Sequence, residues 1–162
     1  MKLSERTYLI LFSAVLLALV VWTVFFIPDE APRTVLNLYR TVKSVQTLNI
    51  AEHAYAAQHL EAGFACKLSD FGGQGAESEL EVGFVDPVLA SGTKAGYEFE
   101  IACSIPREDR KVSSYTVSAV PTKPGITGVD ALCSDQSGEI WHSENGSISD
   151  CFANHKIERR FR

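Results

Sequence analysis

The chain contains one long stretch without charged residues, from Tyr8 to Ile27. This stretch constrains the possible folds more than any other feature of the sequence. About 20 apolar residues are enough to cross a bilayer as an α-helix. A cleaved secretory signal is the alternative, but its apolar core is shorter, about 7–15 residues, and small residues follow it. Here the bulky pair Phe25 and Phe26 leads, through an isoleucine, directly into proline. We therefore predict an uncleaved transmembrane helix over residues 7–27.

Charges on either side of the predicted span indicate its orientation. Lys2 and Arg6 precede the span, whereas the acidic residues Asp29 and Glu30 follow it directly. An excess of basic residues marks the cytoplasmic side of a membrane helix. We therefore expect a single-pass protein with a cytoplasmic N-terminus, and the lipid bilayer is one of its predicted partners.

The second predicted element is a long amphipathic helix from Arg33 to Leu60. Pro32 stands at its start, where proline is tolerated, and neither glycine nor proline interrupts it before Gly63. Apolar residues recur at helical spacing on one face of this helix: Val35, Leu38, Val42, Val45, Ala56 and Leu60.

Two polar residues, Asn49 and Glu52, interrupt this apolar face. In one interpretation they lie at a solvated break where the helix leaves the head domain. In the other they fix the register against neighbouring helices, as buried polar residues do in helical assemblies. The candidate helix-packing interface comprises Val35, Leu38, Val42, Val45, Asn49 and Glu52.

Beyond the long helix the pattern changes to that of turns and strands. Asp86-Pro87 predicts a short capped helical turn, and Tyr97–Cys103 and Tyr115–Val120 alternate as β-strands do. Ala131–Ser134 and Glu139–His142 predict a hairpin. The class is therefore α+β, with the long helix packed on a small three- to four-stranded antiparallel sheet. The predicted organisation is a tip at 1–6, a transmembrane helix at 7–27, a membrane-proximal long helix at 28–62 and a disulfide-stapled head at 63–162.

Composition and motifs favour a protein without catalytic chemistry. The net charge of −5 and the absence of a basic stripe argue against a nucleic-acid partner. The chain has no Walker loop, no H-E-x-x-H and no G-x-S-x-G. His53 and His59 are six residues apart, on different faces of the helix, and do not form a metal-binding pair. We therefore expect no enzymatic activity, no cofactor, no metal and no small-molecule substrate.

Four cysteines lie beyond the predicted span, on the side where disulfides form. Their even number predicts two structural disulfides, and three pairings are possible. No C-x-x-C is present, which argues against a thioredoxin-like site and a zinc knuckle. The candidate disulfide residues are Cys66, Cys103, Cys133 and Cys151.

The order of elements resembles that of type IV pilins and type II secretion pseudopilins. The chain is atypical of this family, because no Gly-Phe cleavage site of the prepilin peptidase precedes its apolar run. The resemblance implies the bacterial cytoplasmic (inner) membrane, with the head in the periplasm or outside the cell. Five segments between residues 44 and 143 carry it: SVQTLNIAEHAYAAQH, GFACKLSDFGG, FVDPVLASGTKAGYEFE, YTVSAVPTKPGITG and CSDQSGEIWHS.

The resemblance also implies a function and a disulfide pairing. The implied function is that of a non-enzymatic pilin-like or minor pseudopilin-like subunit, which assembles through its N-terminal helix with identical or related subunits or with secretion or pilus machinery. The alternative is a non-assembling, membrane-anchored accessory or binding protein that reuses a pilin-like head. The expected bridges are Cys66–Cys103, from the end of the helix to a strand, and Cys133–Cys151, around the hairpin as in many pilins.

The length of the second helix leads to a further expectation. A helix from Arg33 to Leu60 is about 40 Å long at 1.5 Å per residue. A sheet of three or four strands is only about 15–20 Å across. The part from Val35 to Val45 is therefore expected to project beneath the head, with its apolar face exposed for contact with other subunits.

Overall fold

The protein is described by a computed structural model. The chain forms two compact units, Met1–Ala31 and Pro32–Arg162. In the first unit, residues 12–19 are helical. The second unit contains a long helix, an antiparallel sheet and three short helices. The structure describes four stretches of the chain: residues 12–19, 32–71, 85–104 and 111–157.

The predicted membrane helix is not found in these four stretches. No helix in them is both long and apolar enough to cross a membrane. The eight described helical residues, 12–19, account for about 12 Å at 1.5 Å per residue, against a hydrocarbon core of about 30 Å. The predictions of a spanning helix over 7–27 and of an inner-membrane location are corrected accordingly. The rest of that segment (1–11 and 20–31, which includes the predicted tip at 1–6) lies outside the described residues.

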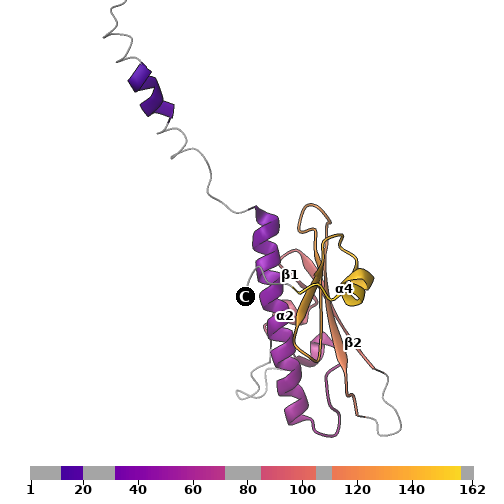
Figure 1. Cartoon of the computed structure of the whole chain (residues 1–162). Coiled ribbons are helices and arrows are strands. Elements are labelled where there is room, and N and C mark those ends of the chain that lie inside the picture. Colours follow the sequence, from indigo (N-terminus) through magenta and orange to yellow (C-terminus); the bar gives the residue numbers. More distant parts are fainter. Residues whose placement is uncertain (1–11, 20–31, 72–84, 105–110, 158–162) are drawn as a thin grey trace, which may run out of the picture. The chain divides into compact units, whose positions relative to one another are not determined.

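Helix α2 (Arg33–Gln58) covers one face of the sheet (Figure 1). It ends two residues before the predicted end, because the backbone of His59 leaves the helical conformation, although its amide still donates to the carbonyl of Tyr55. Gly63 then turns the chain with φ +82°, where a side chain would also clash with the backbone of Val112. The apolar side chains that α2 buries follow the helical period: Leu38, Val42, Val45, Leu48 and Ala51.

The sheet has five strands rather than the predicted three to four. All neighbours pair antiparallel in the order β1-β2-β3-β4-β5. The additional strand is β1, which has only two residues and is therefore too short to show an alternating pattern. The bounds are β1 Thr93–Lys94, β2 Tyr97–Cys103, β3 Tyr115–Pro121, β4 Ala131–Asp135 and β5 Ile140–Ser143.

The two faces of the sheet have different environments. Every second residue of β2 and β3 is buried and joins the apolar core beneath α2, as the strand period requires. The short helix α4 (Ile148–Asn154) lies on the opposite side of the sheet from α2 (Figure 1), where it contacts β4 and β5. These two strands are therefore covered on both faces, whereas the outward side chains of β2 are mostly exposed and those of β3 are half-buried.

The remaining short helices lie at the ends of the core. The predicted capped turn at Asp86-Pro87 is confirmed as α3 (Pro87–Ala90), where the amide of Leu89 donates to the Asp86 carboxylate at 3.1 Å. A 3₁₀ turn, η1 (Leu68–Phe71), buries the ring of Phe71. Helix α4 was not predicted, although Ser147 followed three residues later by an acidic residue is a helix-start pattern.

Candidate functional site

Two disulfides hold the second unit together, with the predicted pairing. Cys66 is bonded to Cys103, with Cα atoms 5.4 Å apart, and the bridge ties the segment after α2 to the end of β2. Cys133 is bonded to Cys151, with Cα atoms 6.1 Å apart, and this bridge fixes α4 on β4. Each bridge stabilises the unit by about 3–4 kcal/mol in the chain-entropy account. Both confirm the expected disulfides, and their place in the fold supports a structural role.

A buried polar cluster connects α2 to the sheet at Asn49, which is only 5% exposed. Its side-chain amide donates to the Ser134 hydroxyl at 2.8 Å, and its carbonyl oxygen accepts from the Tyr115 hydroxyl at 3.2 Å. Ser134 in turn donates to the backbone carbonyl of Glu139 at 2.7 Å. One side chain of α2 therefore fixes the helix to both β3 and β4. Tyr115 and Ser134 were not singled out from the sequence.

Glu52 lies one turn further along α2 and is completely buried. Its Oε2 accepts a hydrogen bond from the amide of Ala65 at 2.9 Å. Within the described residues its Oε1 has no hydrogen-bond partner. Burial raises the pKa of Glu52 to about 7; the Ala65 hydrogen bond opposes this shift, and the nearby charge of Asp70 adds to it. The carboxyl group is therefore protonated or ionised according to pH in the neutral range.

Glu52 also affects the ionisation of the neighbouring tyrosine. Burial raises the pKa of Tyr115 well above its usual value, and the negative charges of Glu52 and Asp135 contribute to the rise. The Tyr115 hydroxyl consequently stays protonated and keeps donating to Asn49. The cluster therefore contains a permanent donor at Tyr115 and one group, Glu52, that changes charge near neutral pH.

These contacts correct the predicted interface on the long helix. Leu38, Val42 and Val45 are buried in the core of this chain, so they are not free to meet another subunit. Asn49 and Glu52 do not lie at a solvated break, and the hydrogen-bond partners found for them belong to their own chain. Of the six predicted interface residues, only Val35 is exposed, at 42%.

The geometric reason for the correction is the direction in which α2 crosses the sheet. The prediction compared the helix with the width of the sheet, but α2 runs along the strands (Figure 1). The seven residues of β2 extend about 23 Å at 3.3 Å per residue. The buried stretch of α2, from Leu38 to Glu52, is about 23 Å long at 1.5 Å per residue. The two lengths match, so the apolar face of the helix is covered.

The opposite side of α2 faces solvent and combines apolar with basic side chains. Ile50 is 71% exposed and Tyr39 42% exposed, and the ammonium group of Lys43 lies 5.9 Å from the centre of the Tyr39 ring. The helical period places these residues on one side, opposite the buried face. We call this surface the outer helix face; it consists of Arg33, Leu36, Tyr39, Arg40, Lys43, Thr47 and Ile50.

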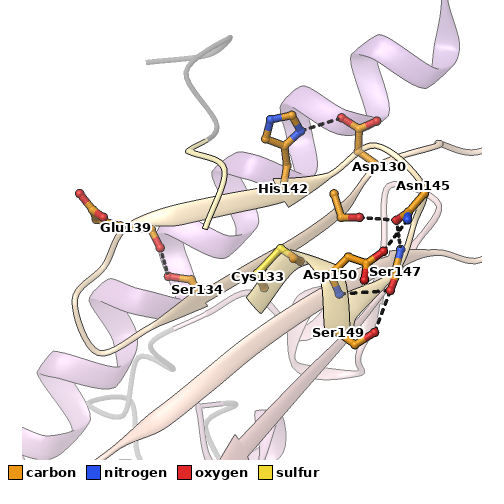
Figure 2. The surroundings of a disulfide bond; sticks show 11 residues. Asp130, Cys133, Ser134, Glu139, His142, Asn145, Ser147, Ser149 and Asp150 are labelled. Carbon is orange, nitrogen blue, oxygen red and sulfur yellow. Dashed lines mark hydrogen bonds and ion pairs between the residues drawn. A yellow bond between two sulfur atoms is a disulfide. The ribbon is translucent and has the colours of Figure 1, made fainter. Parts of the chain in front are cut away.

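A second group of polar side chains surrounds the Cys133–Cys151 bridge (Figure 2). His142 of β5 and Asp130, which precedes β4, are both buried, with Nδ1 and Oδ2 3.3 Å apart. The Asn145 side chain accepts from the amide of Ser147 at 3.0 Å and donates to Asp150 at 2.5 Å. These contacts shape the turn that leads into α4. The Asn145-Gly146-Ser147 sequence therefore has a structural role as a helix-start turn.

An open depression of about 390 Å³ lies at one end of the sheet. The end of β2, the start of β3 and the turn after β4 form its walls, which include serine and threonine residues and one acidic residue, Asp135. Within the described part of the chain, no group of three or more His, Cys, Asp or Glu side chains could hold a metal ion. The residues that line the depression are Ala102, Cys103, Ser104, Ser114, Tyr115, Thr116, Asp135 and Gln136.

Neither protein-family models nor characterised proteins nor solved structures give a match to this chain. The resemblance to pilins and pseudopilins therefore stays a prediction. The second unit offers three features that bear on function: a helix fixed on a sheet by buried polar contacts, two disulfides, and an outer helix face that no other described element covers.

Proposed function

We propose that this chain is a non-enzymatic, pilin-like subunit that works by assembling with identical or related subunits. The observation that carries the proposal is the outer helix face, on which Leu36, Tyr39 and Ile50 expose apolar surface along one side of α2. Apolar side chains grouped on one exposed face are typical of protein contact surfaces. A minor pseudopilin-like role, with secretion or pilus machinery as the partner, uses the same surface.

The interior of the second unit supports this proposal. The polar groups at the helix–sheet boundary bind α2 to the strands through hydrogen bonds within the chain. The Cys66–Cys103 bridge fastens the chain just beyond the C-terminal end of α2. A helix held in this way presents its outer face in a fixed geometry, so that little conformational entropy is lost when a partner binds.

The test replaces exposed apolar side chains on the outer helix face of the full chain. Tyr39→Ser combined with Ile50→Ser removes apolar contact area, which we expect to weaken self-association roughly tenfold or more. Sedimentation velocity over a concentration series measures the association. The matched control is Ile126→Ser, because Ile126 is equally exposed, at 70%, but lies in the loop before β4. A wild-type chain that stays monomeric at every concentration contradicts the proposal.

A second candidate function is that of an accessory or binding protein that reuses a pilin-like head without assembling. The open depression at the end of the sheet favours this candidate, because serine and threonine residues and the acidic residue Asp135 line it. A monomeric chain in which ligand-induced chemical-shift changes are confined to the depression would support this candidate over assembly.

A further inference from the structure

The outer helix face carries basic charge only. Arg33, Arg40 and Lys43 are all exposed, whereas the single acidic residue of α2, Glu52, is buried on the other side of the helix. None of the three basic side chains forms an ion pair with another described residue. The face is therefore a basic strip that also contains exposed apolar side chains.

The open side of the sheet carries the opposite charge. Glu98 and Glu100 of β2 are exposed, and no described residue forms an ion pair with either. They are the only charged residues of β2 and β3, and they pair across the strands with Val120 and Ser118. We call this surface the outer sheet face; it consists of Glu98, Glu100, Ala102, Thr116, Ser118 and Val120.

The two faces lie on opposite sides of the same unit. The alternating residues of β2 point either toward α2 or away from it, and the glutamates belong to the second set. The outer helix face points away from the sheet in the other direction (Figure 1). The basic and acidic faces therefore cannot meet within one copy, but a second copy can present one face to the other.

We propose that the outer helix face of one copy docks on the outer sheet face of the next. The proposal rests on the assembly function proposed above and names its contact. Opposite charges orient the two copies, and Leu36, Tyr39 and Ile50 meet the apolar side chains of Ala102 and Val120. A symmetric contact of two outer helix faces brings basic groups together and is disfavoured. Because the two surfaces differ, the contact is heterologous. Because they point in opposite directions, the contact continues from copy to copy into an open row.

Charge reversal tests this contact in the full chain. The sheet variant carries Glu98→Lys and Glu100→Lys, and the helix variant carries Arg40→Glu and Lys43→Glu. Each variant alone brings like charges together, so we expect its self-association at low salt to weaken at least about tenfold. A mixture of the two variants contains opposite charges at every contact, and association is expected to return. A chain with all four changes is also expected to associate. This variant is the folding control, because its association requires that the substitutions leave the fold intact.

A photo-crosslinker at Thr47, which is exposed on the outer helix face, gives a second readout. In a mixture of ¹⁴N- and ¹⁵N-labelled full chains, we expect it to capture a β2 or β3 peptide of the other copy. Capture of α2 from the other copy, or association that ignores the charge reversals, overturns this contact and leaves assembly itself intact. A wild-type chain that never associates overturns the proposed function as well.

Discussion

Replacement of Glu52 by glutamine tests the account of the buried carboxyl group. The pKa of Glu52 is raised from 4.5 in the unfolded chain to about 7 in the fold. Between these values the folded state binds more protons than the unfolded state, so the free energy of unfolding falls as pH rises through this window. A rise from 4.5 to about 7, at 1.36 kcal/mol for each pKa unit, lowers the free energy of unfolding above pH 7 by about 3 kcal/mol.

Glutamine has the same shape, keeps an oxygen that can accept from the Ala65 amide, and does not titrate. The Glu52→Gln variant is therefore expected to match the wild-type chain near pH 4.5 and to exceed its stability by about 3 kcal/mol at pH 8. Urea unfolding followed by circular dichroism at a series of pH values measures this difference.

The matched control is Glu100→Gln, because Glu100 is exposed on β2 and lies outside the buried cluster. Its stability difference from the wild-type chain should stay nearly constant with pH. Parallel pH profiles for the wild-type chain and Glu52→Gln would refute the reasoning, because they would mean that the pKa of the carboxyl is the same in the folded and the unfolded chain. If the free energy of unfolding of the wild-type chain instead rose relative to that of Glu52→Gln as the pH increases, the expected sign of the pH dependence would be wrong.

Asn49→Ala is expected to cost about 2–4 kcal/mol, because it leaves the Tyr115 and Ser134 hydroxyls without their buried partner. In a double-mutant cycle with Tyr115→Phe, the stability loss of the double variant should be smaller than the sum of the two single losses. Thr47→Ala on the outer helix face is the control and should leave the stability almost unchanged. Ser147→Ala removes the hydroxyl that accepts from the Asp150 amide at 3.2 Å and should cost about 1 kcal/mol. Amide hydrogen exchange should then increase in α4 and stay unchanged in β2.

Local patterns in the sequence predicted the elements that show their own periodicity. α2 and β2 were predicted at or near their observed bounds, because burial on one side imposes a period of 3.6 or 2 residues. β1, with two residues, is too short for any period to show. α4 has seven residues, about two turns, so it is too short for its own period to predict it.

The polar cluster could be predicted only in part, since its contacts are distant in sequence. Asn49 and Ser134 are 85 positions apart, and no spacing rule connects them. The sequence did single out Asn49 and Glu52 as polar interruptions of an apolar face. It could not show whether strands of the same chain or helices of another would cover them. The choice depended on the direction of α2 along the strands, which is a property of the tertiary structure.

The two disulfides have a mechanical consequence. When a chain is pulled from its ends, each bridge excludes the segment that it encloses from extension. The bridges enclose sequence separations of 37 and 18 residues. At about 3.5 Å per extended residue, they hold back about 130 Å and about 60 Å of contour length. Under tension α2 can be peeled from the strands only as far as Cys66, and the sulfur bridge to β2 then carries the load.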